Sequence, residues 1–136
     1  MKRRTFIAAT AAALLAAPAF AGGATVDYTP GLIKNALAEG KTVFVDFAAK
    51  WCSTCARQER VIGALRSANP AYEEMVFVKV DWDEYSRHEV TKSRNIPRRS
   101  TLIVLKGDEE IGRLVAGTSE SDIKALMDKG LAAADS

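Results

Sequence analysis

The chain has 136 residues, of which 48% are hydrophobic and 26% charged, and its formal net charge is +2. The positive excess lies at the start, because without Lys2, Arg3 and Arg4 the 19 Lys and Arg fall to 16 against 17 Asp and Glu. The length allows one compact domain after a leader, and the remaining charge gives no reason to expect a nucleic-acid partner.

Residues 1–21 have the layout of a secretory signal peptide. The basic start is followed by an alanine-rich apolar run from Phe6 to Ala17 and by the small-x-small cleavage pattern Ala19-Phe20-Ala21. The run is too short for a spanning helix, although an uncleaved anchor stays open as the alternative. Arg3-Arg4-Thr5-Phe6-Ile7 also resembles a twin-arginine signal, so the route, Sec or twin-arginine, is open. We expect export to the periplasm and a single domain over residues 22–136.

The first half of that domain alternates helices and strands. Residues 31–39 predict a short helix ending at Gly40. Residues 42–48 form an almost unbroken apolar run, typical of a strand buried on both faces. A helical pattern follows from Cys52 to about Ala68, and residues 75–80 predict a second buried strand.

The second half closes with a hairpin and a helix. Residues 84–94 predict a polar surface helix, and residues 101–105 and 110–115 predict strands joined by a turn at Lys106-Gly107-Asp108. Ser119 can cap a last helix that runs to Lys129, with Gly130 as its end.

This order predicts an α/β fold with a central mixed sheet. Strands separated by helices favour parallel pairing with right-handed crossovers, and the hairpin adds an antiparallel edge. Helices then cover both faces of the sheet.

Cys52 and Cys55 are separated by Ser53 and Thr54. A bridge across two residues closes a very short loop and stabilises a fold weakly, so the spacing favours a redox switch. Cys52 falls where a buried strand gives way to a helix, where free N–H groups and the helix dipole favour a thiolate. Cys55 lies one helical turn on. We expect Cys52 to attack a substrate disulfide and Cys55 to resolve the mixed disulfide.

Other uses of the cysteine pair have less support. A zinc site needs about four ligands, and beyond the two cysteines the chain has the single histidine His88. A c-type haem attachment needs His directly after Cys55, where the chain has Ala56. A purely structural bridge stays open as a minor alternative.

The segment Val45-Asp46-Phe47-Ala48-Ala49-Lys50-Trp51-Cys52-Ser53-Thr54-Cys55 resembles the active-site segment of the thioredoxin family. The resemblance runs from about Leu32 to Leu131. Trp-Cys-x-x-Cys after a buried strand, with Asp six residues before the first Cys, is more specific than a bare Cys-x-x-Cys. Residues 44–55 are similar in particular to the C-terminal domain of DsbD and to small periplasmic thioredoxins, which mostly act reductively. The resemblance implies a thioredoxin fold.

The same resemblance implies two residues that assist the cysteines. Asp46 matches the buried carboxylate that relays a proton to or from the resolving cysteine. Independently, an Asp inside an apolar strand should have a raised pKa, unless it lies exposed at an edge. Lys79 matches the family's lysine near that carboxylate, although a lysine can also simply reach out of a strand end.

The resemblance also assigns residues that contact substrate. Trp51 matches the aromatic residue beside the motif, as a lid and contact surface, with a core position as the alternative. Gly117 matches a glycine that lets substrate backbone approach, or it serves a turn before the last helix. The full set of expected substrate contacts is Trp51, Ser53, Thr54, Arg99, Ser100 and Gly117.

The chain departs from the family at its cis-proline. Counting back from the hairpin turn puts Ser100 at that position, whereas the rival alignment uses Pro97 and leaves two arginines at the start of a buried strand. A cis bond before a non-proline residue costs roughly 3–4 kcal/mol, so we expect a trans bond before Ser100. Arg98 and Arg99 then flank the groove, where they select acidic partners, favour the Cys52 thiolate or are solvated loop charges.

We therefore predict a periplasmic thiol–disulfide oxidoreductase, a reductase of exported protein disulfides. Its expected partners are protein disulfides and a membrane electron donor of the DsbD type, and we expect a monomer without a cofactor. Three alternatives stay open: a disulfide oxidase or isomerase, a dimer that binds metal or an iron–sulfur cluster through the Cys pair, and a redox-inert binding module. Ser53-Thr54 matches neither the Gly-Pro of typical thioredoxins nor the Pro-His of strong oxidants.

Overall fold

The computed structural model describes residues 24–136, and the predicted signal peptide lies outside this range. Its elements are, in chain order, β1 (Thr25–Asp27), α1 (Leu32–Ala38), β2 (Thr42–Ala48), α2 (Ser53–Ala68), the 3-10 helix η1 (Pro70–Glu74), β3 (Val76–Asp81), α3 (Trp82–Tyr85), α4 (Glu89–Lys92), β4 (Thr101–Lys106), β5 (Glu109–Val115) and α5 (Glu120–Ala134). Within residues 24–136, none of the helices is both long and apolar enough to cross a membrane.

The five strands form one mixed sheet in the order β1-β3-β2-β4-β5. β3 pairs in parallel with β1 and β2, while β4 pairs antiparallel with both β2 and β5. We predicted parallel pairing for strands that are separated by helices, and this prediction was wrong for β4, which is antiparallel to β2. Strand β3 ends next to the end of β2, where Asp81 lies beside Ala48. Strand β4 begins at this same edge of the sheet, where Thr101 lies beside Phe47. Strand β4 must then run the opposite way.

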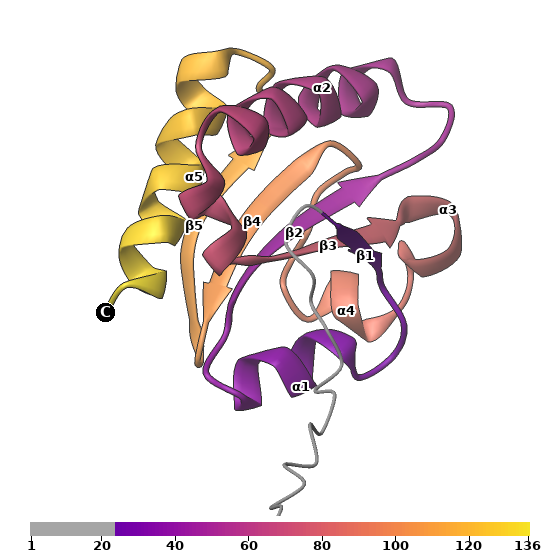
Figure 1. Ribbon diagram of the computed structural model, residues 1–136. Coiled ribbons are helices and arrows are strands. Elements are labelled where there is room, and N and C mark those ends of the chain that lie inside the picture. The colour runs from indigo at the N-terminus through magenta and orange to yellow at the C-terminus, as the bar shows by residue number, and fades with distance from the viewer. Residues whose placement is uncertain (1–23) are drawn as a thin grey trace, which may run out of the picture.

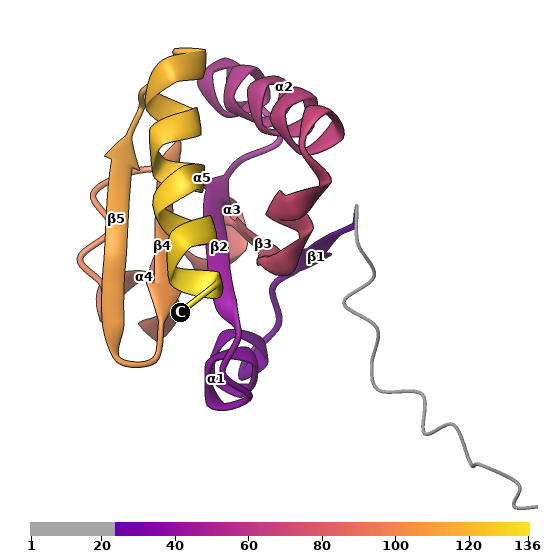
Figure 2. The same ribbon diagram turned by 60° about the vertical axis from the view of Figure 1, so that its left-hand side comes forward.

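Helices cover both faces of this sheet, as predicted (Figures 1 and 2). One core lies under α1 and the α3–α4 segment and includes Ile33, Val45 and Tyr85. The other lies under α2 and α5 and includes Phe44 and Ile62.

Strand β2 carries the alternation that positions the site. All seven of its residues are buried. Val45 packs into the α1-side core and Phe44 into the α2-side core, so alternate residues face opposite helices. Asp46 and Ala48 therefore share the α2 side of the sheet with Phe44.

Two predicted helix limits were wrong. Residues 84–94 form parts of two short helices, because the Oγ1 of Thr91 donates to the carbonyl of Tyr85 and His88 is extended, starting a new turn. Helix α5 continues past Gly130 to Ala134. A Cβ at Gly130 would lie 2.4 Å from the Sδ of Met75, so this glycine permits close packing and does not end the helix.

Candidate active site

Cys52 lies at the junction between β2 and α2. It is the N-cap of α2 with extended backbone, and its Sγ accepts a hydrogen bond from the N–H of Cys55 at 3.1 Å. The sulfur therefore occupies the position in which a helix N-terminus stabilises negative charge.

Cys52 and Cys55 form a disulfide, with 5.2 Å between their Cα atoms. Both residues are almost fully buried, at 4% and 1% exposure, and they pack against Ala48, Ala49 and the partly buried Trp82. The apolar surroundings limit the access of solvent to the sulfurs.

Ser100 faces the two sulfurs from the loop before β4. Its Oγ lies 3.2 Å from the Sγ of Cys52 and 3.1 Å from that of Cys55. Pro97 is exposed, and the described residues contain no cis peptide bond. Ser100, with a trans bond before it, thus occupies the position opposite the cysteines.

Gln58 holds this loop by hydrogen bonds from α2, and the sequence did not lead us to predict this residue. It lies on α2 and is fully buried, and its Nε2 donates to the carbonyls of Ser100 at 3.0 Å and Gly117 at 2.9 Å. The sequence did contain a signal for Gln58, because it lies between Cys55 and Ile62 at the spacing of the buried face of α2. A polar side chain on a buried face needs hydrogen-bond partners.

Trp51 is the large exposed side chain beside the disulfide, at 61% exposure. Its Nε1 donates to both carboxylate oxygens of Asp83 at 3.0 Å. The Arg99 guanidinium lies over its ring at 4.4 Å from the centroid. The indole is thus held in place at the surface and is not a core residue, and Asp83 is a second residue that the sequence reasoning missed.

Three further predicted contact residues have simple positions. Ser53 is exposed and Thr54 half-buried in the first turn of α2. Gly117 packs against Leu114, so closely that a Cβ would lie 2.7 Å from its Cδ1. Their roles toward substrate stay predictions.

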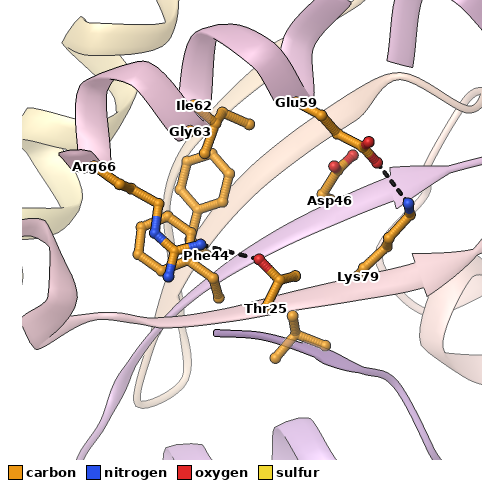
Figure 3. A pocket seen from close by; sticks show the side chains of 10 residues that line it. Thr25, Phe44, Asp46, Glu59, Ile62, Gly63, Arg66 and Lys79 are labelled. Carbon is orange, nitrogen blue, oxygen red and sulfur yellow. Dashed lines mark hydrogen bonds and ion pairs between the residues drawn. The ribbon is translucent and has the colours of Figure 1, made fainter. Parts of the chain in front are cut away.

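Asp46 lies in a pocket beneath α2, shown in Figure 3. It pairs in register with Lys79 of β3, whose Nζ forms an ion pair with Glu59 at 2.6 Å. The Oδ1 of Asp46 is buried without a hydrogen-bond partner among the described residues. Glu59 stands one turn after Cys55 on α2, and its role was not predicted.

The environment of Asp46 favours its protonated form. Burial raises the pKa of the carboxyl, the Glu59 carboxylate raises it further, and Lys79 opposes both, leaving the pKa at about 7. This carboxyl can therefore accept or donate a proton near neutral pH.

Metal-ligand side chains do not gather in the part of the chain that the structure describes. Residues 24–136 hold no cluster of three or more His, Cys, Asp or Glu arranged for a metal ion.

Known proteins are similar to this chain in sequence and in fold. The Thioredoxin family model matches residues 26–129. Thioredoxin 1 of Plasmodium falciparum is 36% identical over 93 residues, which are 68% of this chain and 84% of that protein. Thioredoxin H2-1 of Oryza sativa is 31% identical over 86 residues, 63% of this chain and 59% of that protein. The crystal structure of Trxlp from Edwardsiella tarda has a TM-score of 0.65 and 32% identity, covering 75% of this chain and 98% of that one.

Proposed function

The chain belongs to the thioredoxin family of thiol–disulfide oxidoreductases, and from this premise we propose that it is a periplasmic reductase of exported protein disulfides. Cys52 and Cys55 carry the reaction as a dithiol/disulfide pair. The reductive direction and the compartment are the two parts of this proposal that go beyond family membership.

The observation that carries the dithiol cycle is the buried carboxyl of Asp46, and the reductive direction follows from the expected resemblance of residues 44–55 to periplasmic thioredoxins that act reductively. In a reductase, Cys55 must lose its proton before it can resolve the mixed disulfide, so a base is needed on its side of the sheet. Asp46 lies on the α2 side of β2, two residues before Ala48, which packs against Cys55. A pKa of about 7 lets this carboxyl take up that proton near neutral pH.

The reaction then runs in two exchanges. The Cys52 thiolate attacks one sulfur of the substrate disulfide, a Cys52–substrate disulfide forms, and the other substrate sulfur leaves as a thiolate. Cys55 gives its proton to Asp46 and attacks the Cys52 sulfur, which forms the internal disulfide and releases the second substrate thiolate. Two electrons pass from the cysteine pair to the substrate, and the leaving thiolates take protons from solvent.

The compartment rests on the first 21 residues of the sequence. Their basic start, alanine-rich run and Ala19-Phe20-Ala21 pattern support cleavage and export. A periplasmic reductase needs electrons from the membrane, so we propose a donor of the DsbD type that reduces the Cys52–Cys55 disulfide. This donor choice rests on the expected resemblance of residues 44–55 to the C-terminal domain of DsbD.

Client trapping in cells tests direction and compartment together. Cys55→Ser should strand mixed disulfides between Cys52 and exported proteins, whereas the matched control Cys52→Ser should strand none. The trapped chain should begin near Gly22, as mass spectrometry would show. Full-length chain bound to non-exported proteins would refute the compartment, and a trap that holds only an oxidising partner would refute the direction.

A further inference from the structure

The hydroxyl of Ser100 lies within hydrogen-bond distance of both reacting sulfurs, at 3.2 Å from Cys52 and 3.1 Å from Cys55. In the disulfide neither sulfur carries a proton, so the single hydroxyl proton of Ser100 is donated to one of the two sulfurs or shared between them. The residue is fully buried, so water does not compete for this hydroxyl.

We propose that Ser100 is a catalytic residue whose hydroxyl donates a hydrogen bond to whichever cysteine sulfur is the thiolate. The proposal rests on the dithiol cycle described above. In the attacking state the acceptor is Cys52, and in the resolving state it is Cys55. Ser100 keeps its proton and carries no electrons in either exchange, so it changes the free energy of the thiolates and leaves the balance of the reaction unchanged.

The backbone around Ser100 is built to hold this hydroxyl in place. Ser100 has a left-handed conformation, with φ of 64°, which is unfavourable for a residue other than glycine. Its N–H donates to the carbonyl of Phe47 at 2.7 Å, and its carbonyl accepts from the N–H of Ala116 at 2.8 Å. These bonds fix the loop against β2 on one side and the end of β5 on the other.

Gln58 completes this support and acts as a positioning residue. Its Nε2 joins the carbonyls of Ser100 and Gly117, which come from two different loops, and it does so from the helix that begins at the cysteines. Since Gln58 and Cys55 lie one turn apart on α2, the same helix sets the place of a sulfur and of the loop that faces it. Gln58 thus acts on the sulfurs through Ser100.

The measurable consequence is the ionisation of the Cys52 thiol. A hydrogen bond to a charged group is stronger than one between neutral groups, so removing this donor should lower the acid dissociation constant of the thiol about tenfold. The midpoint of thiolate formation should then move up by about one pH unit.

The test is a titration of the reduced protein, followed by thiolate absorbance near 240 nm, with alkylation and mass spectrometry to identify the cysteine that ionises first. Ser100→Ala removes the hydroxyl alone. Ser100→Gly removes it too and suits the left-handed backbone, so it should fold even where Ser100→Ala does not. Thr101→Val is the matched control, because the Thr101 hydroxyl donates to the carbonyl of Arg98 and not to sulfur.

Both Ser100 variants should raise the midpoint, and Thr101→Val should leave it unchanged. Gln58→Met should raise it less, and adding Gln58→Met to Ser100→Ala should cause no further rise, because Gln58 acts through Ser100. Folded Ser100→Gly protein with the wild-type midpoint would overturn the proposal. The titration uses no disulfide substrate, so a wild-type protein that fails to reduce disulfides would refute the reductase assignment and leave this inference standing.

Discussion

Lys79 of β3 forms an ion pair with Glu59 of α2, with 2.6 Å between Nζ and Oε1, at the side of the pocket that holds the Asp46 carboxyl (Figure 3). The two partners act on Asp46 with opposite signs. The Glu59 carboxylate raises the pKa of Asp46, and the Lys79 ammonium lowers it. Burial makes the largest contribution to the raised pKa of Asp46, and the two partners adjust it in opposite directions.

Neutralising Glu59 and neutralising Lys79 should move the pKa of Asp46 in opposite directions. Glu59→Gln removes an anion, so the pKa should fall, and Lys79→Met removes a cation, so it should rise. Carbon-13 NMR titration of the Asp46 carboxyl measures both. Glu89→Gln is the matched control, because its pair with Lys34 is exposed on the surface. Shifts of the same sign in the two variants would contradict this account of the pocket.

Asp46 should also make stability depend on pH. The pKa of Asp46 is raised from 3.8 to about 7 in the folded protein. The contribution of this carboxyl to the free energy of unfolding is therefore fully present below about pH 4 and is lost as the pH rises through 7. Over that window the group should remove on the order of 4 kcal/mol from the free energy of unfolding. Asp46→Asn has no such charge, so its urea-unfolding free energy should fall less between pH 4 and pH 8. Equal declines in the two proteins would mean that Asp46 ionises normally.

Truncation of Trp51 should impair substrate reduction more than folding. The side chain is 61% exposed, so Trp51→Ala should change the free energy of unfolding by no more than about 0.5 kcal/mol. The kcat/KM for a protein disulfide such as insulin should fall about tenfold, because the indole offers the exposed aromatic contact beside the cysteines. Trp51→Phe keeps a ring for Arg99 and loses the bond to Asp83, so its loss should be smaller. Unchanged kcat/KM in Trp51→Ala would remove this residue from the substrate site.

Two helix glycines should respond oppositely to alanine. At Gly130 a Cβ would lie 2.4 Å from the Sδ of Met75 and 3.1 Å from Val104, so Gly130→Ala should destabilise the fold by about 1–3 kcal/mol. At Gly63 on α2 a Cβ would meet nothing within 4 Å, so Gly63→Ala should stabilise it by about 0.5–1 kcal/mol. Thermal unfolding of both variants compares them directly, and a stabilised Gly130→Ala would show that α5 can shift away from the sheet.

The sequence predicted the elements that carry strong local patterns. The seven buried residues of β2 and the turn at Gly107, with φ of 57°, follow from local composition and geometry. Strand β1 was missed because it has three residues, too few for an alternation, and gains its place by pairing with β3. The break between α3 and α4 depends on a side-chain bond from Thr91 to Tyr85, which no local pattern indicates.

The candidate site shows the same division. The motif pointed to Cys52 and Cys55, and the resemblance to the thioredoxin family pointed to Asp46 and Ser100. A lone carboxyl in an apolar strand supported Asp46 independently, and a count from the hairpin turn gave the position of Ser100. Gln58, Glu59 and Asp83 were missed because their partners lie 42, 20 and 32 residues away in the chain, and only the fold brings them together. Glu59 and Asp83 have no feature in the sequence that separates them from ordinary surface residues, whereas the buried spacing of Gln58 on α2 was a signal that was overlooked.

The reduction potential of the Cys52–Cys55 pair tests the proposed direction most directly. The oxidised and reduced forms can be quantified by alkylation after equilibration in dithiothreitol or glutathione redox buffers of known potential. A reductase should give a value near that of thioredoxin, roughly −270 mV. A value near that of a strong oxidant, about −120 mV, would contradict the proposed reductase and mark the protein as a disulfide oxidase.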